Sequence, residues 1–321
     1  MDVATAFKIN LAASFGTVFG GLIIFSQYLL RVVNPCVMAI LLSASGGITL
    51  FQSLVLLFGN SVQEFSSAFS RNDDASDASS SDTVTGKAWL TTTGCFGAGI
   101  VLNYFLDVFV QKLTPGQRQS AFARMHAGDT FQGSLETMET GTPELKSPVE
   151  LMQSRHLLRM DEATKEKLQR MGILNGIAIA IHNMPEGVAT LVASSEHTFI
   201  GLALAIGVAL HNMAEGIAVA APVYFATGSR WKGMMWCVVG SVAQHIGGLL
   251  AYAILGKNAD DFSQGVLYGL MAGMLTCISI KDIFPTAHMY ANGRVHLVSS
   301  GGLIGMVVMS SSLILFKYLG V

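Results

Sequence analysis

The sequence predicts an all-α, multi-pass membrane protein in which eight transmembrane helices form a bundle. Three observations predict this class. Of the 321 residues, 51% are hydrophobic and only 12% are charged, whereas roughly 25% of the residues in a soluble domain are charged. The apolar residues gather in stretches of the roughly 20 residues that a helix needs to cross a bilayer. Polar segments separate these stretches. Together the three observations disfavour a soluble enzyme.

Eight apolar stretches have the length of a membrane-spanning helix. The first stretch lacks the basic start and the small-residue cleavage pattern of a signal peptide, so we count it as a span. In chain order the expected spans cover residues 7–30, 35–58, 88–111, 171–194, 198–226, 232–255, 263–285 and 295–319. We expect them to form a single transmembrane domain over residues 1–321.

Two of the connections between the spans are long. Residues 59–87 are rich in Ser and Asp, above all between 66 and 86, and such a composition buries too little apolar surface to become ordered. We therefore expect a disordered extracytoplasmic loop over 59–87. Residues 112–170 are mixed in charge, and we expect them to form a long cytoplasmic loop.

The orientation in the membrane follows from Lys and Arg, which collect in short cytoplasmic loops. Arg31, the pair Arg230 and Lys232, and Arg294 lie in the first, fifth and seventh connections, and the third connection is also rich in basic residues. The even-numbered connections are acidic instead. We therefore expect both termini on the extracytoplasmic side, either of the plasma membrane or of an intracellular membrane.

Net charge and cysteine usage disfavour two further classes. The 19 Lys and Arg residues against 21 Asp and Glu residues give a net charge of −2, which does not supply the basic surface that holds a nucleic acid. The four cysteines lie in apolar stretches without a C-x-x-C spacing, so the sequence predicts neither a disulfide framework nor a thiolate zinc site. We expect them to pack as small apolar side chains.

A short internal repeat carries the chemistry. The motif I-H-N-M-P-E-G at 181–187 returns 29 residues later as L-H-N-M-A-E-G, and both copies lie in the middle of an expected span. His182 and Glu186 are four residues apart, as are His211 and Glu215. Each pair therefore projects from one face of its helix and can bind a common ion.

The two carboxylates need a counter-charge, because an ionised side chain at the centre of a membrane helix costs at least about 2.5–3.5 kcal/mol. No Lys or Arg lies between residues 181 and 226, so a metal ion is the expected partner. Hydrogen bonding between helices is the alternative explanation. Two imidazoles and two carboxylates suit Zn²⁺ in tetrahedral geometry, and Fe²⁺, Co²⁺ and Mn²⁺ are alternatives on ligand type.

The two H-N-x-x-E-G motifs, the run A-P-V-Y-F-A-T-G-S-R at 221–230 and the eight spans resemble the ZIP (Zrt/Irt-like) divalent-metal transporters. The resemblance is strongest to the bacterial zinc-transporting branch of this family. It implies transport toward the cytoplasm by alternating access, with the divalent ion as the transported ligand and with no cofactor. It implies that the protein is not an enzyme. The implied partners are the ion and the lipid bilayer, and a homodimer stays open.

The resemblance also implies a binuclear site between the fourth, fifth and sixth spans. The first metal position would be formed by His182, Glu186, His211 and Glu215. The second position would use Asn183, Asn212, the two shared carboxylates and one residue of the sixth span. That residue is usually acidic in this branch, but the sequence has Gln244 there.

The neutral Gln244 changes the charge balance. The two glutamates offset one divalent ion, but two ions would leave a charge of +2, so we expect the second position to be weak or empty. The neighbouring His245 is either a substitute ligand or a hydrogen-bonding residue between helices. In the seventh span Asp282 matches an acidic position of the family and is a candidate relay ligand toward the cytoplasm. Lys281 beside it either reaches the lipid headgroups or repels the departing ion.

Two other functions stay open at this point. A non-transporting metal sensor or scaffold of the same fold would fit the departures at Gln244 and Lys281. An intramembrane metallohydrolase would need an open water position and a free general base, as the motif H-E-x-x-H provides. The repeat offers no spare Glu for that role.

Overall fold

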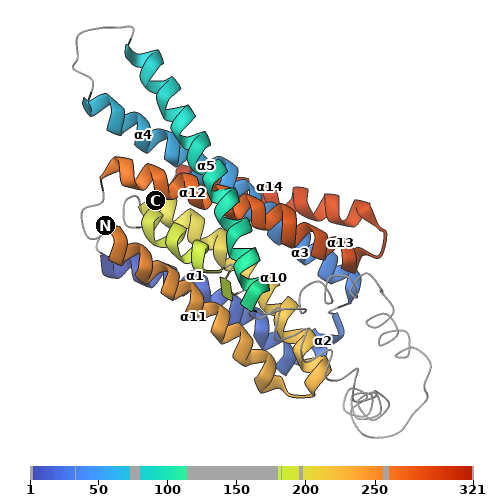
Figure 1. Ribbon diagram of the computed structural model, residues 1–321. Helices are drawn as coiled ribbons and strands as arrows, with labels where there is room; N and C mark the ends of the chain where they lie inside the picture. The colour runs from blue at the N-terminus through green and yellow to red at the C-terminus, as the bar shows by residue number, and fades with distance from the viewer. Residues whose placement is uncertain are drawn as a thin grey trace, which may run out of the picture.

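The computed structural model is built of helices and turns throughout the part of the chain that it describes (Figure 1). This part covers residues 3–32, 34–72, 80–113, 180–181, 183–194, 198–255 and 260–319. Its first half contains α1 (Val3–Gly21), the 3₁₀ turn η1 (Leu22–Phe25), α2 (Gln27–Val32), α3 (Pro35–Phe51), the π-helical turn η2 (Gln52–Leu57), α4 (Phe58–Asn72) and α5 (Ser80–Leu113). The second half contains the helical residues 183–194, then α10 (Thr198–Thr227), α11 (Arg230–Leu255), α12 (Asp261–Ile278), the π-helical turn η3 (Ser279–Ile283), α13 (Phe284–Ala291) and α14 (Val295–Leu319). The predicted all-α class is confirmed.

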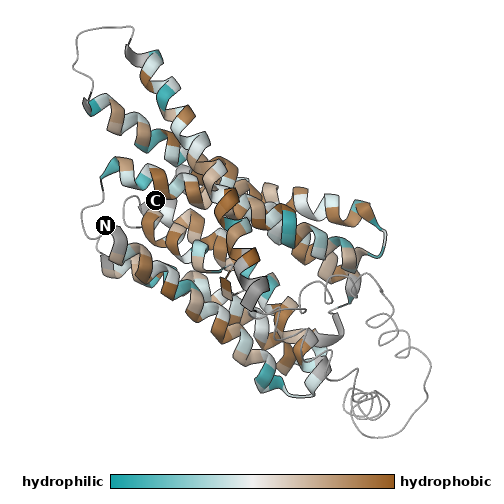
Figure 2. Cartoon of the chain, in the orientation of Figure 1, coloured by the Kyte–Doolittle hydropathy of each residue, from teal (hydrophilic) through white to brown (hydrophobic). Residues whose placement is uncertain are grey.

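Six helical stretches in the described residues are long and apolar enough to cross a membrane. They cover Ala4–Phe25, Cys36–Arg71, Gly201–Ala221, Arg230–Ala253, Asp261–Ala291 and Val295–Leu315. Each of these stretches overlaps one of the eight expected spans, and the largest difference is at the second, which ends at Arg71 and not at residue 58. Hydrophobic residues cover most of their length, as the brown colouring in Figure 2 shows. The chain is therefore a multi-pass integral membrane protein.

The two other expected spans are not among these six stretches. Residues 88–111 lie inside helix α5. Of the expected span 171–194, only 180–181 and 183–194 belong to the described residues, and they are helical. A bundle of eight transmembrane helices therefore stays a prediction. The expected cytoplasmic loop at 112–170 lies outside the described residues apart from its first two, which end α5.

The helices pack in two groups that meet at α10 and α3 (Figure 1). In the first group α1 packs against both α10 and α11. In the second group α3 packs against α13 and α14, and α12 packs against α4 and α5. A buried side chain crosses from one group to the other, because Gln52 Nε2 in η2 donates a hydrogen bond to the carbonyl oxygen of Leu204 in α10 at 2.9 Å.

Glycines bring α1 and α10 into direct backbone contact. A Cβ atom at Gly16 or Gly20 of α1 would overlap a carbonyl oxygen of α10, and a Cβ atom at Gly216 of α10 would overlap the carbonyl oxygen of Thr17. Small residues at such crossings let membrane helices approach closely and gain dispersion energy. The approach holds α1 beside the repeat residues 210–216, so polar groups of α1 can reach them.

Glycines likewise bring α11 into backbone contact with the first copy of the repeat. A Cβ atom at Gly187 would overlap the carbonyl oxygen of Gln244, and a Cβ atom at Gly247 would overlap the carbonyl oxygen of Met184. Helix 183–194 and α11 therefore touch through their backbones at the level of Glu186. The two copies of the repeat and the Gln244 segment of α11 thus lie around one region of the bundle.

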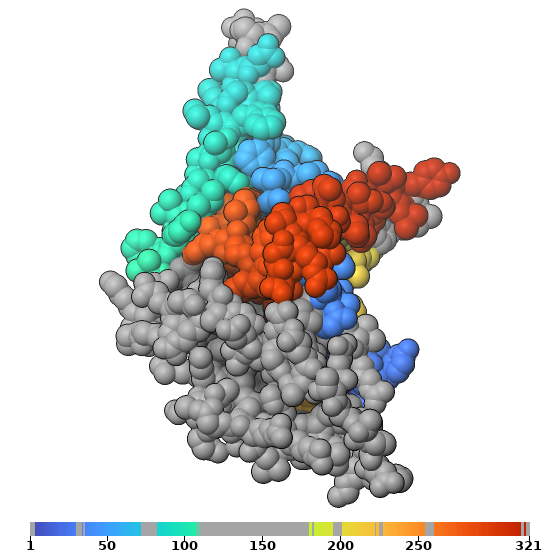
Figure 3. All heavy atoms as spheres, turned by 90° about the vertical axis from the view of Figure 1, so that its right-hand side faces the viewer, coloured from blue at the N-terminus to red at the C-terminus, as the bar shows by residue number. Residues whose placement is uncertain are grey.

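The prediction of a disordered loop over 59–87 is wrong for its described part. Residues 59–72 continue the helix that begins at Pro35, and residues 80–87 form the start of α5. The helix Cys36–Arg71 has 36 residues, which is about 54 Å at 1.5 Å per residue and exceeds the roughly 30 Å of a bilayer core. Figure 1 shows α4 and the start of α5 projecting together beyond the rest of the bundle. In Figure 3 α5 extends past the orange and red helices α12 to α14.

An aromatic cluster explains why this segment is helical. Within the Ser-rich sequence, Phe58, Val62, Phe65 and Phe69 recur at the spacing of one helical face. Phe65 is fully buried, and its ring lies 5.2 Å from that of Phe262 in α12 and 5.9 Å from that of Phe69, between ring centroids. Average composition does not reveal this face, because a few large aromatic side chains at helical spacing provide its packing.

Candidate metal centre

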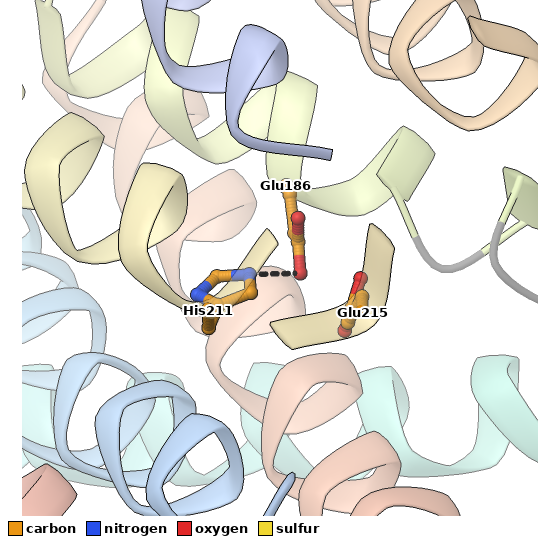
Figure 4. Close-up of side chains that lie close together, drawn as sticks. All are labelled: Glu186, His211 and Glu215. Atoms are coloured by element: carbon orange, nitrogen blue, oxygen red, sulfur yellow. Dashed lines mark hydrogen bonds and ion pairs between the residues drawn. The ribbon is translucent and has the colours of Figure 1, made fainter. Parts of the chain in front are cut away.

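Three side chains from two helices converge in the middle of the protein. The ligand atoms of Glu186, His211 and Glu215 all lie within 4.8 Å of one another. His211 Nε2 and Glu186 Oε1 are 2.8 Å apart and form a hydrogen bond. Figure 4 shows the imidazole of His211 and the carboxylates of both glutamates directed toward one small space. The three side chains are only 1%, 1% and 3% exposed, so the space is closed to water.

The local sequence explains the convergence. His211 and Glu215 are one helical turn apart on α10 and therefore share a face. Glu186 comes from the helix of the first repeat copy, which the glycine contact with α11 holds in place. The second repeat copy is held by the glycine contact between α1 and α10. Two backbone contacts between helices thus position Glu186 relative to His211 and Glu215, which follow it by 25 and 29 positions in the sequence.

The arrangement is suited to a divalent cation. Two carboxylates in a site excluded from water repel each other and lose their hydration, and a cation between them offsets both costs. One imidazole nitrogen and two carboxylate oxygens are ligands that Zn²⁺ accepts, and a fourth position stays available for a further ligand. The arrangement can therefore hold a divalent cation between Glu186, His211 and Glu215.

Three of the other predicted ligands, His182, Asn183 and Asn212, lie within four residues of a cluster residue in the sequence, and a fourth, Gln244, lies in α11. His182 lies outside the described residues, and its role stays a prediction. Asn183 is fully buried, three residues before Glu186, and has no hydrogen-bond partner among the described residues. Asn212 and Gln244 are fully buried and bond to each other, with Asn212 Nδ2 donating to Gln244 Oε1 at 2.9 Å.

The remaining predicted ligands are not part of the three-residue cluster. His245 Nδ1 donates to the carbonyl oxygen of Ser241 on its own helix at 2.9 Å. Asp282 lies in η3. The Nζ atom of Lys281 lies 4.4 Å from the ring centroid of Tyr104 in α5, a cation–π distance. Lys281 therefore faces α5 and not the cluster.

Comparison with known proteins identifies the family. The family model described as the ZIP zinc transporter matches residues 3–313, which is nearly the whole chain. The chain belongs to the ZIP family. The resemblance to this family is thereby confirmed. The expectation that the chain is not an enzyme is also confirmed, because this family consists of transporters. The function of this ZIP protein is divalent metal transport, and the family description supports zinc as the transported ion.

Curated relatives agree with this assignment, two of them along nearly the full length of the chain. A protein named zinc transporter ZupT from Clostridium perfringens is 30% identical over 317 residues, which are 98% of this chain and 97% of the relative. A protein of the same name from Chlorobaculum parvum is 30% identical over 98% of both chains. Another, from Chlorobium chlorochromatii, is 40% identical over 54% of this chain and 64% of its own length.

One residue of the ZIP site region was missed by the sequence analysis. Asn10 in α1 is fully buried, and its Oδ1 accepts a hydrogen bond from Gln244 Nε2 at 3.2 Å. The signal available in the sequence was a single Asn within an apolar span. That signal is weak, because many membrane helices carry an isolated amide that bonds to a neighbouring helix.

Proposed function

We propose that this ZIP protein carries Zn²⁺ toward the cytoplasm through a site formed by Glu186, His211 and Glu215, with His182 as a fourth ligand. The observation that supports the proposal is the convergence of three buried ligand atoms within 4.8 Å in the helical bundle. Ionisable residues inside a membrane bundle mark ion pathways, because their cost is tolerated only where they serve a function. Fe²⁺, Co²⁺ and Mn²⁺ are the further candidate ions.

Transport through this site requires a conformational change. The ion must exchange its hydration shell for protein ligands on one side and regain water on the other. Glu186, His211 and Glu215 are closed to water in this structure, so the helices around them must move for the ion to enter or leave. The boundary between the two helix groups, at α3 and α10, is where we place that movement. Alternating access follows from it.

The direction and the topology are also part of the proposal. The basic connections after the first, fifth and seventh spans favour a cytoplasmic location for them. In Figure 1 α1 begins and α14 ends at the same end of the bundle, which supports termini on one side of the membrane. We place both termini on the extracytoplasmic side and the net flux of zinc toward the cytoplasm. A homodimer stays an open expectation.

We further propose that a single ion occupies the site. Glu186 and Glu215 supply two negative charges, which balance one divalent ion. The position where the resemblance implies a third acid is held by the neutral Gln244, and both of its amide atoms bond to other amides. A second ion would therefore bring uncompensated positive charge into a site that is buried away from water, which is unfavourable. Two tight zinc equivalents per chain in a titration would contradict this stoichiometry.

The test is uptake of radioactive zinc into proteoliposomes that contain the purified protein. Wild-type protein is expected to carry zinc, and Glu186→Ala and Glu215→Ala are expected to abolish uptake while the protein stays folded. Parallel assays with iron, manganese and cobalt define selectivity. Zinc binding without uptake would refute transport and support the sensor alternative. Undiminished uptake by both variants would place the ion pathway elsewhere.

A further inference from the structure

A chain of amide side chains connects three helices beside the metal centre. Asn10 of α1, Gln244 of α11 and Asn212 of α10 are each fully buried. Gln244 Nε2 donates to Asn10 Oδ1 at 3.2 Å, and Asn212 Nδ2 donates to Gln244 Oε1 at 2.9 Å. The same Asn212 nitrogen also reaches the carbonyl oxygen of Ala13 at 3.4 Å. Both hydrogens of the Asn212 amide are therefore engaged.

The backbone carbonyl of Ala13 sets the direction of this chain. An amide side chain has nearly the same shape when its oxygen and nitrogen are exchanged, so a chain of amides alone could run in either direction. A carbonyl oxygen can only accept, and it therefore requires the nitrogen of Asn212. Asn212 then donates to Gln244, which presents its oxygen there and its nitrogen to Asn10.

The direction leaves one atom of Asn212 for another partner. Asn212 Oδ1 is buried and has no hydrogen-bond partner among the described residues. Asn212 precedes Glu215 by three residues, so both lie on the same side of α10. A buried amide oxygen without a partner is unfavourable, and a cation held by Glu186, His211 and Glu215 would satisfy it.

We propose that Asn10 and Gln244 are positioning residues that turn the Asn212 amide so that its oxygen, and not its nitrogen, faces the bound ion. This proposal rests on the proposed metal site. It gives Gln244 a role other than that of a ligand, because both polar atoms of its amide form hydrogen bonds to the other two amides. A Glu at this position could accept from Asn212 but, when ionised, could not donate to Asn10 Oδ1. The neutral amide is therefore the residue that completes the connection.

The surrounding helices make room for Asn10. A Cβ atom at Gly248 of α11 would lie 2.6 Å from Asn10 Nδ2, which is too close for any side chain. The Asn10 amide therefore occupies the space that the missing side chain of Gly248 leaves on α11. Gly248→Ala consequently offers a second way to displace Asn10, with no change to any amide group.

The experiment measures zinc affinity by competition with a chelator on the purified full chain in lipid nanodiscs. Asn10→Leu removes the acceptor for Gln244 and is expected to weaken zinc binding by roughly 10-fold, the lower end of the effect of lost outer-shell partners. Asn10→Asp keeps an acceptor oxygen whether or not it is protonated, and it is expected to bind zinc at least as tightly as wild type. Gly248→Ala is expected to resemble Asn10→Leu.

Zinc-edge X-ray absorption provides a readout that a packing defect would not change. We expect one oxygen ligand fewer at the zinc of Asn10→Leu than at that of wild type. Asn103→Leu is the matched control, since Asn103 is a buried amide in α5 with an unpartnered Oδ1 among the described residues. It should leave both affinity and ligand count unchanged.

The outcomes separate this proposal from the metal site itself. If wild type binds no zinc, the proposed function fails. If wild type binds zinc and Glu186→Gln does not, but Asn10→Leu and Gly248→Ala bind as wild type does, only the positioning role is refuted. Equal losses for Asn10→Leu and Asn10→Asp with an unchanged ligand count would also refute it, because they would indicate a packing role. If Asn10→Leu does not fold, Gly248→Ala decides.

Discussion

Replacing Glu186 by Gln removes one charge from the metal centre while keeping the shape of the side chain. The Gln oxygen can still accept a hydrogen bond from His211 Nε2, so the fold should lose only about 1 kcal/mol, the net value of one such bond. The effect on the ion is larger. A divalent ion next to Glu215 alone keeps a charge of +1 in a site whose three side chains are at most 3% exposed.

The size of the loss follows from the cost of an unpaired buried charge. Removing one partner from a buried ion pair costs about 3–5 kcal/mol, and 1.4 kcal/mol corresponds to a tenfold change in affinity. Zinc affinity should therefore fall by roughly 100- to 4,000-fold on the same scale.

Isothermal titration of the purified variant measures this loss, and uptake into proteoliposomes shows whether transport falls with it. Glu64→Gln in α4 is the control, because α4 packs on α5 and α12 and not on α10. A Glu186→Gln variant that binds zinc as tightly as the wild type would refute the assignment of Glu186 as a ligand.

Three further predictions concern the helix contacts. Gly20→Ala places a Cβ on a carbonyl oxygen of α10 and should destabilise the protein by about 1–3 kcal/mol, as measured by thermal unfolding. Gly97→Ala is the control and should leave the stability unchanged, because a Cβ there meets no atom within 4 Å. Gln52→Met removes the hydrogen bond to the carbonyl oxygen of Leu204 in α10, which is worth about 1 kcal/mol. The rate of zinc uptake should therefore change by up to about fivefold, while the equilibrium zinc affinity stays constant. Phe65→Ala should cost about 3–5 kcal/mol of stability and leave zinc affinity intact; an unchanged melting temperature would contradict the role of the aromatic cluster.

Local sequence patterns were sufficient for the membrane class and for the candidate ligands. The thickness of the bilayer fixes the length of an apolar span, so hydrophobic runs reveal spans without knowledge of their neighbours. The spacing of four residues between His211 and Glu215 fixes their common face for the same reason, because helix geometry is local. The repeat then indicated that Glu186 belongs with them.

Composition failed where a few side chains decide the structure. The segment 59–72 has the average composition of a loop, but Phe65 and its aromatic neighbours recur on one helical face and bury that face against Phe262. The partner lies almost two hundred positions away in the sequence. The energy that orders the segment therefore comes from a contact that no local window contains.

The contacts around the metal centre were decided by the tertiary structure alone. Glu186 meets His211 across 25 positions, and Gln244 meets Asn10 across 234. Both contacts depend on helix crossings at glycines, where an added Cβ atom would overlap an atom of the neighbouring helix. Sequence by itself determined which side chains have metal-binding chemistry and which face of each helix carries them. Packing determined which of these side chains meet, because the separation and rotation of neighbouring helices depend on all the residues between them.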